Sequence, residues 1–207
     1  MDAVGSDQVS RGPSIPIDRG VAPADRRTAA EGATGLLRRW GEDLRFAWRD
    51  FVFSGLGGSK WLPRTVRRGI FTMAGASVKS APGAAFRFAG RPRNLTLGSS
   101  VYMNQSVFIE AIAPVTIGDD TAVGMEAMVL TSHHPLDDAG AWQVKAQGRE
   151  VVIGDRVWIG ARAIVLPGAV IESDVVIAAG AVVTGRCVAQ GVYAGVPARR
   201  IRDYSSR

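Results

Sequence analysis

Two adjacent histidines, His133 and His134, lie in the segment TSHHPLDD at residues 131–138 and are the only histidines of the 207-residue chain. An imidazole can take a proton from a hydroxyl group near neutral pH, which makes histidine a frequent general base. Taken alone, either residue is better explained as a solvated loop histidine. The side-by-side pair predicts a proton-transfer site if the rest of the chain places it on a rigid scaffold.

The chain offers few other reactive side chains. Its single cysteine, Cys187, excludes an intrachain disulfide and a cysteine-based zinc cluster, so we interpret it as a small apolar filler in a reducing compartment. No serine stands in a nucleophile motif. With 46% hydrophobic and 21% charged residues, the composition predicts one globular domain.

The net charge of +6 comes from arginines that are scattered singly or in pairs. No basic run is interleaved with aromatic residues, so we do not expect nucleic-acid binding. The distribution indicates an arginine-rich solvated surface with a local site for an anionic ligand.

The first third of the chain differs from the rest. Residues 1–34 show no periodicity and predict a disordered lead-in without a secretory signal. Residues 35–73 predict a helical N-terminal segment, with an amphipathic helix over 36–53 and a short helix over 65–73. The arginines and aromatic residues of 36–53 suit a membrane surface, although packing against the main domain or a neighbouring subunit is the commoner outcome.

A six-residue repeat governs the remainder. An α-helix cannot keep one face apolar on this period, because six residues at about 100° each end about 120° out of register. Six residues can instead form a short extended segment and a turn, and three such units complete a triangular coil. Glycines after several of the aliphatic residues predict corners with tight packing or unusual φ. The aliphatic residues that set the period, and that we expect to point to the coil axis, are Ile117, Val123, Val129, Ile153, Ile159, Val165, Ile171, Ile177 and Val183.

The repeat predicts a mainly β fold, a parallel β-helix over residues 74–193, followed by a C-terminal tail over 194–207. Leu97, Met103 and Ile109 continue the period upstream. Residues 131–150 interrupt it and predict a long excursion loop with the two histidines at its base. Loops of this length in compact domains tend to be functional or disordered.

The hexads resemble the hexapeptide-repeat family, which implies that the parallel β-helix is left-handed. Asn104 and Glu110, then HPLD, VWIGARAIVLPG and AGVPARRIR, resemble the maltose and galactoside branch of the sugar O-acetyltransferases over roughly residues 95–202. The resemblance implies an acetyl-CoA-dependent O-acetyltransferase that acts on a sugar hydroxyl by direct transfer. In that family the histidine before the proline of the loop is the general base, which corresponds to His134 and leaves His133 second.

The resemblance also implies acceptor and donor residues. Asn104 and Trp158 correspond to residues at the acceptor and acyl-transfer site, although Asn104 is as well explained as a left-handed corner and Trp158 as interface packing. Glu110 lies near the family's acceptor-binding acid, whose own position holds Ile112 here. Backbone N–H groups of Gly160 and Ala161 are candidate oxyanion donors. Ala161, Ala179 and Thr184 correspond to the pantetheine groove, and Arg186, Arg199 and Arg202 to cations near the CoA phosphates.

The family further implies a homotrimer with active sites between subunits, and no metal. A γ-class carbonic anhydrase shares the fold, but its zinc needs three histidines. An antibiotic O-acetyltransferase and a non-catalytic β-helix scaffold stay open as alternatives. The segment WLPRTVRRGIFTMAG resembles the lead-in of acetyltransferases of exopolysaccharide synthesis, which implies a surface-glycan sugar or its precursor as acceptor. We therefore expect a cytoplasmic protein, with residues 36–53 at the inner face of the membrane.

Overall fold

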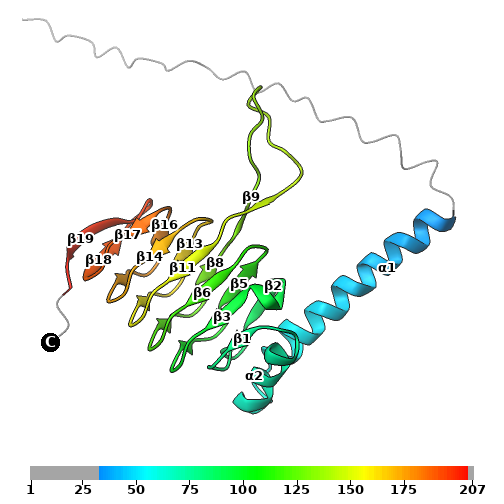
Figure 1. Ribbon diagram of the computed structural model, residues 1–207, viewed down its shortest axis with the longest axis horizontal. Helices are drawn as coiled ribbons and strands as arrows, with labels where there is room; N and C mark the ends of the chain where they lie inside the picture. Colours follow the sequence, from blue (N-terminus) through cyan, green and yellow to red (C-terminus); the bar gives the residue numbers. More distant parts are fainter. Residues whose placement is uncertain (1–32, 205–207) are drawn as a thin grey trace, which may run out of the picture. The chain divides into compact units, whose positions relative to one another are not determined.

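A computed structural model of the protein describes residues 33–204 and contains a parallel β-helix built from three sheets (Figure 1). Sheet A consists of β1 (Ser77–Val78), β3 (Leu95–Leu97), β6 (Val115–Ile117), β11 (Val151–Ile153), β14 (Val170–Ile171) and β17 (Arg186–Cys187). Sheet B consists of β2 (Arg87–Gly90), β5 (Phe108–Ala111), β8 (Met128–Val129), β13 (Ile164–Val165) and β16 (Val182–Val183). Sheet C consists of β4 (Tyr102–Met103), β7 (Ala122–Val123), β12 (Trp158–Ile159), β15 (Val176–Ile177), β18 (Gly191–Ala194) and β19 (Arg199–Asp203).

The chain visits sheets A, C and B in turn, so each coil contributes one strand to every sheet, as in β3, β4 and β5. Neighbouring coils pair in parallel without slippage, and Trp158 lies opposite both Ala122 and Val176. Within sheets A, B and C of the described chain, the antiparallel pair is β19 with β18. The predicted mainly β coil of hexads is therefore confirmed.

The core lies along the axis of the coil. All nine aliphatic residues that set the six-residue period are at most 1% exposed. The upstream residues Leu97, Met103 and Ile109 are also buried, and Val115 is buried beside Ile117 where the frame shifts. Burial of one aliphatic side chain per hexad explains why the period is strict, since a shift would turn an apolar side chain out to water.

The corners differ in part from the sequence prediction. Each glycine after a core aliphatic residue has ordinary φ, and the next coil lies close against it. A Cβ on Gly160 would come within 2.4 Å of the backbone N of Ala179, and one on Gly124 within 2.5 Å of that of Ala161. Tight packing is thus the reason for these glycines. The alternative prediction, that they adopt unusual φ, was wrong. Among the described non-glycine residues, the left-handed conformation falls at positions with φ between 52° and 59°: Ala85, Ser100, Ser106, Asp120, Glu126, Arg156, Arg162, Asp174 and Gln190.

The N-terminal elements are α1 (Ala33–Asp50), the π-helix η2 (Phe51–Leu56) and α2 (Arg64–Met73), and a short 3-10 helix η3 spans Pro92–Asn94. The chain divides into two compact units after Asp43. The helix predicted for 36–53 thus runs on as a π-helix, and the second begins one residue early, with Pro63 at its N-cap. The disordered lead-in predicted for residues 1–34 lies outside the described residues except for the first turn of α1.

Four phenylalanines close the first coil against η2 and α2. Phe71 of α2 packs on Phe53 and Phe88 with ring centroids 5.4 Å apart, and on Phe86 at 5.7 Å. All four rings are at most 9% exposed. A solenoid needs such a cap, because the end coil has no neighbour to cover its apolar interior. None of the helices in residues 33–204 is long and apolar enough to cross a membrane.

Candidate functional site

The histidine segment stands out from the coil as a hairpin between β8 of sheet B and β11 of sheet A (Figure 1). Its neck is an antiparallel pair, β9 (Ser132–His133) with β10 (Gln147–Gly148). Below the neck, the backbone N–H of Arg149 donates to the carbonyl of Thr131 over 2.8 Å. The excursion is therefore closed at its base, and the two histidines begin where the chain leaves the rigid coil.

Thr131 anchors this base. It is fully buried, and its Oγ1 donates to the carbonyl of Glu110 over 2.8 Å. The same oxygen accepts from the backbone N–H groups of Ile112 and Ala113, over 3.0 and 3.2 Å. One hydroxyl thus links the exit of the loop to the preceding coil, at the point where the frame shifts. Sequence reasoning missed this residue, whose signal was a threonine at a position that faces the core.

Glu110 holds the next residue of the loop. Its Oε2 accepts from the backbone N–H of Ser132 over 3.0 Å and from the Ser132 hydroxyl over 2.7 Å. The predicted acceptor-binding carboxylate is therefore engaged one residue before His133, where it fixes the loop. Ile112, at the position of the family's acid, is exposed and offers no charge. Ser132 is a second residue that the sequence did not single out.

His134 is oriented by the opposite strand of the hairpin. Its Nδ1 lies 2.8 Å from the carbonyl oxygen of Gln143, and its ring meets the ring of Trp142 edge-on at 5.7 Å. A carbonyl oxygen only accepts, so Nδ1 carries the proton and the neutral ring presents Nε2 with its lone pair. His133 differs, since its Nδ1 is buried and has no partner among the described residues. The ranking of His134 above His133 as general base stays a prediction.

The hairpin beyond the histidines is internally bonded. Asp137 Oδ1 accepts from the backbone N–H groups of Ala139 and Ala141, over 3.0 and 2.8 Å. Leu136 and Trp142 form a bridge between the two strands. These bonds hold the Gln143 carbonyl opposite His134 and so support the orientation of the imidazole.

A cavity of about 410 Å³ opens beside the base of the excursion. It has a largely aromatic wall, and Arg49 closes one side by donating to the carbonyl of Gly90. Arg87 lies 5.7 Å from the centre of the Phe108 ring. Because Glu110 and Ile112 belong to the same wall, the cavity adjoins the segment that carries the histidines. The lining residues are Phe46, Arg49, Asp50, Phe53, Ser54, Arg87, Phe88, Ala89, Gly90, Phe108, Glu110 and Ile112.

Asn104 lies at a different corner of the coil from the histidines. It follows β4 of sheet C and precedes β5 of sheet B, and its Oδ1 accepts from the N–H of Gln105 over 2.8 Å. Its φ is not positive, so the left-handed interpretation was wrong, and Ser106 takes that conformation instead. The histidines leave at the corner between sheets B and A. Within one chain the width of sheet B separates Asn104 from His134.

Trp158, Gly160 and Ala161 share the corner of Asn104. Trp158 is 60% exposed on the outer face of sheet C. The N–H of Gly160 donates to the carbonyl of Ile177 over 2.7 Å, so it is not free to stabilise an oxyanion, and that part of the prediction was wrong. The N–H of Ala161 donates to no acceptor in residues 33–204 and is the remaining candidate.

The other predicted donor residues are spread over the C-terminal coils. Ala179 is exposed at the corner of Ala161, whereas Thr184 is exposed at the corner between sheets B and A. Arg186 lies on sheet A, where its Nε donates to Glu172 over 2.7 Å. The hydrogen bond from the N–H of Ala189, and then the contact with Arg186, hold the pKa of Glu172 below its ordinary range. Arg186 is therefore tied to a carboxylate and is a weaker candidate for a phosphate contact.

Arg199 and Arg202 lie exposed on β19, at the far end of sheet C. Arg199 donates only to the carbonyl of Ala198, over 3.0 Å. Arg200 between them is engaged with Asp203 and the carbonyl of Gln190, over 3.0 and 2.8 Å. The two predicted arginines thus keep their guanidinium groups available to an anion, whereas Arg200 holds the tail in place.

Neither a metal centre nor a cysteine nucleophile emerges in the described part of the chain. No group of three or more His, Cys, Asp or Glu residues is placed to hold a metal ion in residues 33–204. Cys187 is buried in the last coils, and burial raises the pKa of its thiol to about 11. A thiol with such a pKa is a poor nucleophile near neutral pH.

Known proteins resemble this chain in both sequence and fold. Residues 150–185 match the family described as bacterial transferase hexapeptide (six repeats). Nodulation protein L of Rhizobium meliloti is 47% identical over 76 residues, which is 36% of this chain and 41% of that protein. A protein of Escherichia coli provisionally named the lipopolysaccharide biosynthesis O-acetyl transferase WbbJ is 36% identical over 115 residues, 51% of this chain and 59% of its own. The chain therefore spans about half the length of these relatives.

Solved structures share the coil. A maltose O-acetyltransferase of Clostridium difficile superposes with a TM-score of 0.63 at 25% identity, over 74% of this chain and 83% of that one. A hexapeptide-repeat acetyltransferase of Vibrio cholerae, solved in complex with acetyl coenzyme A, gives 0.65 at 25% identity, over 73% and 83%. The resemblance to hexapeptide-repeat acetyltransferases of the maltose and galactoside type, drawn from the sequence, is thereby confirmed.

Proposed function

We propose that this protein is an acetyl-CoA-dependent O-acetyltransferase that acetylates a sugar hydroxyl with His134 as general base. The observation that carries the proposal is the Gln143 carbonyl at 2.8 Å from Nδ1 of His134. It leaves Nε2 as the proton acceptor, on a hairpin whose base is fixed by Thr131 and Glu110. Similarity to named acetyltransferases supplies the reaction class.

In the proposed reaction, Nε2 of His134 removes the proton from an acceptor hydroxyl while the oxygen attacks the thioester carbon of acetyl-CoA. The C–S bond then breaks, CoA leaves as its thiol and the proton returns from the imidazolium to the sulfur. A general base of this kind contributes about 10²–10⁴-fold to the rate. The N–H of Ala161 is the donor we assign to the developing oxyanion. No covalent acetyl-enzyme is needed.

The donor is proposed to lie along the corner between sheets C and B. Ala161 and Ala179 present small side chains in successive coils there, which leaves room for a thin pantetheine arm. Arg199 and Arg202 at the end of sheet C suit the phosphates of CoA because their guanidinium groups are unpaired with carboxylates in residues 33–204. The Vibrio cholerae neighbour, solved with acetyl coenzyme A, supports this assignment.

The acceptor is proposed to be a sugar of a surface glycan or its precursor, bound in the cavity beside Glu110. Aromatic faces such as Phe108 and a polar group such as Arg87 are the usual partners of a sugar ring and its hydroxyls. The similarity to WbbJ, whose name refers to lipopolysaccharide, agrees with this acceptor class.

The assembly is proposed to be a homotrimer. His134 and the Asn104–Ala161 row lie at two different corners of one coil, so a single chain does not bring the base and the donor residues together. A neighbouring copy that sets its C/B corner against the B/A corner of the first would complete the site. Each active site would then use two subunits.

The decisive experiment measures CoA release from acetyl-CoA with a panel of sugars, for the wild type, His134→Ala and the matched control His133→Ala. Acetyl-CoA binding is measured separately by calorimetry. We expect activity with a sugar, a loss of at least about 10²-fold in His134→Ala and unchanged donor binding. Equal losses in both variants would refute the assignment of His134. Absence of acetyl-CoA binding would refute the enzyme and favour a scaffold, and turnover of aromatic antibiotics alone would refute the sugar acceptor.

The shared site is tested by mixing two inactive variants. His134→Ala lacks the base, and Arg199→Ala with Arg202→Ala lacks the CoA cations, so trimers reassembled from both contain some intact sites. We expect the mixture to regain activity that neither variant has alone. A mixture that stays inactive although mass measurements show mixed trimers would place base and donor residues in one chain.

We also propose that α1 places the protein at the inner face of the cytoplasmic membrane. The large apolar side chains of α1, and Phe51 directly after it, are all more than half exposed. Flotation with anionic liposomes tests this, with Trp40→Glu/Trp48→Glu as the variant and Arg38→Gln as a control. Wild-type protein that stays in the soluble layer would refute it. The exposed residues are Leu36, Leu37, Trp40, Leu44, Phe46, Trp48 and Phe51.

A further inference from the structure

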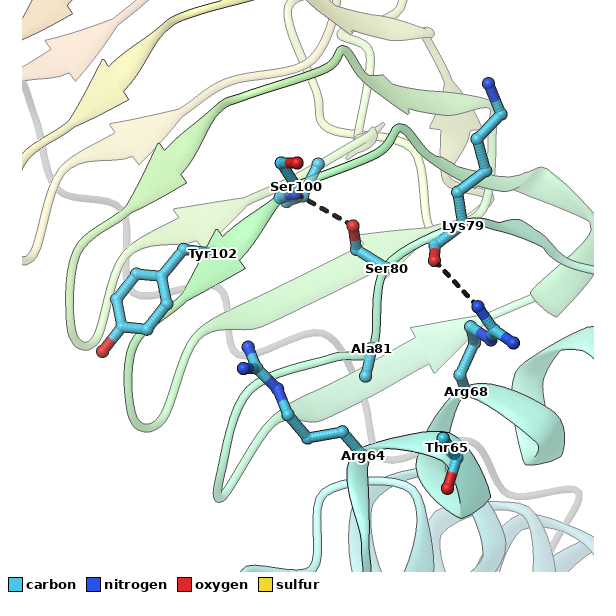
Figure 2. A pocket seen from close by; sticks show the side chains of 9 residues that line it. Arg64, Thr65, Arg68, Lys79, Ser80, Ala81, Ser100 and Tyr102 are labelled. Carbon is cyan, nitrogen blue, oxygen red and sulfur yellow. Dashed lines mark hydrogen bonds between the residues drawn. The ribbon is translucent and has the colours of Figure 1, made fainter.

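A second cavity lies at the opposite end of the molecule from β19, between α2 and the first coil. It measures about 380 Å³ and is lined by both helical and coil residues. Figure 2 shows Arg64 and Arg68 extending from α2 toward the coil residues Ser80, Ala81 and Tyr102. The proposed acetyl transfer uses none of these residues.

The cavity is strongly positive. Arg64, Arg68 and Lys79 line it, whereas no acidic residue does. None of the three forms an ion pair with a carboxylate in the part of the chain that the structure describes. Three cations around one small cavity repel one another, so the site is electrostatically incomplete without an anion.

A fourth cation, Arg67 of α2, does not line the cavity but belongs to the same helix as Arg64 and Arg68. Arg67 is buried, donates through Nη1 to the carbonyl of Pro82 over 2.7 Å and has a buried Nε without a partner in residues 33–204. Burial and the charge of Arg64 both lower the pKa of Arg67. The field of Arg67 is little screened because the group is away from water, which adds to the attraction for an anion in the cavity.

The Arg64 guanidinium is the unused donor that extends into the space (Figure 2). Figure 2 shows the Arg64 side chain extending from the start of α2 toward Tyr102, with no hydrogen bond drawn to it, and the Lys79 ammonium at the rim, turned away. Within residues 33–204, the Arg68 guanidinium donates through Nη1 alone, to the carbonyl of Lys79 over 3.2 Å. Ser80 is fully engaged, because its hydroxyl donates to Gly98 and accepts from Val101. Within residues 33–204, the donors without a partner are therefore the Arg64 guanidinium, the rest of the Arg68 guanidinium and the hydroxyls of Ser100 and Tyr102.

The site is separate from the proposed donor groove. Tyr102 belongs to β4, the last strand of sheet C on this side, whereas Arg199 and Arg202 belong to β19 at the other edge. Five strand spacings of about 4.8 Å separate the two. A CoA molecule bound at Arg199 and Arg202 therefore does not account for the cations around this cavity.

We propose that the cavity between α2 and the first coil binds the phosphate group of a phosphate-bearing ligand, with Arg64 and Arg68 as its principal contacts. Planar guanidinium groups pair with two phosphate oxygens at once, and hydroxyl donors complete the shell. The site goes beyond the acetyl transfer proposed above, and its existence does not depend on that activity. The ligand is either a soluble phosphate or diphosphate compound or the headgroup of a phospholipid, since both carry the same chemistry.

The test is calorimetric titration of the full chain with inorganic pyrophosphate. Arg64→Gln is compared with Arg156→Gln, which removes the same charge from an exposed arginine that is paired with Asp174 and does not line the cavity. We expect Arg64→Gln to weaken pyrophosphate binding by at least about tenfold and Arg156→Gln to leave it nearly unchanged. Saturable binding with this difference supports the site.

Two results would overturn the proposal: no saturable heat with wild-type protein, or equal weakening by the two variants, which would reflect net charge alone. Weaker binding by Arg64→Gln is not expected to result from misfolding, because the Arg64 side chain makes no hydrogen bond within residues 33–204. We expect the melting temperature of Arg64→Gln without ligand to equal or exceed that of the wild type. Neither readout depends on acetyltransferase activity.

Vesicles distinguish the two sources of phosphate. Phosphatidylcholine vesicles with and without phosphatidic acid are sedimented with the wild type, Arg64→Gln and the α1 variant Trp40→Glu/Trp48→Glu. Retention that requires phosphatidic acid and Arg64 identifies a lipid headgroup. Pyrophosphate binding that requires Arg64, without such retention, identifies a soluble ligand. Either result supports the phosphate site, whereas vesicle binding that depends on α1 but not on Arg64, with no pyrophosphate binding, overturns it.

Discussion

Removal of the Thr131 hydroxyl is expected to loosen the base of the excursion loop. Thr131→Val keeps the shape of the side chain but leaves the carbonyl of Glu110 without its donor and the N–H groups of Ile112 and Ala113 without their acceptor. Each partly buried amide left unpaired costs about 1 kcal/mol, the lower end of the usual range, so we expect a loss of about 2–3 kcal/mol in the free energy of unfolding. Thr131→Ser keeps the hydroxyl and loses one methyl group, for about 1 kcal/mol.

Urea unfolding at fixed protein concentration measures both variants. Hydrogen exchange at Ile112, Ala113 and Ser132 then shows whether the loss is local. We expect faster exchange at these amides in Thr131→Val and a lower acetyl-transfer rate, since the base of the hairpin positions His134. A Thr131→Val protein as stable as Thr131→Ser, with unchanged exchange, would refute the role assigned to the hydroxyl.

Three further outcomes follow from the coil itself. Gly160→Ala is expected to cost about 1–3 kcal/mol of stability in urea unfolding, because the new methyl would press on the next coil, whereas Gly185→Ala, with open space around it, is expected to be near neutral. Cys187, with its thiol pKa raised to about 11, is expected to react with iodoacetamide at about pH 8 on the order of a hundredfold more slowly than in urea, as followed by mass spectrometry; rapid labelling of the folded protein would contradict its burial. Glu172 has a lowered pKa in the fold, so its carboxylate stabilises the protein above the ordinary glutamate pKa of about 4.3 and loses this effect as the pH falls through the lower, folded value. Urea midpoints measured downward from neutral pH are therefore expected to fall more for the wild type than for Glu172→Gln, and parallel curves would count against the assignment.

The coil was predictable because its physics is periodic. One aliphatic side chain in six must reach the axis, and a run such as Ile153, Ile159 and Val165 leaves no other fold open. The corner glycines were also visible, but their reason was not. Close approach to the next coil at Gly160 and the left-handed φ at Arg162 both depend on how coils stack, which a single hexad does not show.

The site was predictable only where residue chemistry was unusual. Two histidines in a broken repeat drew attention to His134, but Gln143 acts through its backbone carbonyl, which every residue possesses. Thr131 and Ser132 act through contacts with residues of the preceding coil, which lie 19 and 22 positions earlier in the sequence. Gly160 was assigned an N–H that the stacking of coils already uses. The basic cavity around Arg64 depends on how α2 docks, which no repeat or motif encodes.

The hairpin is also a place where the chain could be divided into two fragments. His134 lies on its outgoing strand and the Gln143 carbonyl on its returning strand, with the exposed turn at residues 137–141 between them. A protease cut in that turn would produce two fragments, each with intact coils, held together by the neck and by the pairing of β6 with β11. The tautomer of the imidazole would then be set across a break in the chain. A split version of this protein, expressed as two separate polypeptides, would regain its proton acceptor only upon reassembly of the halves.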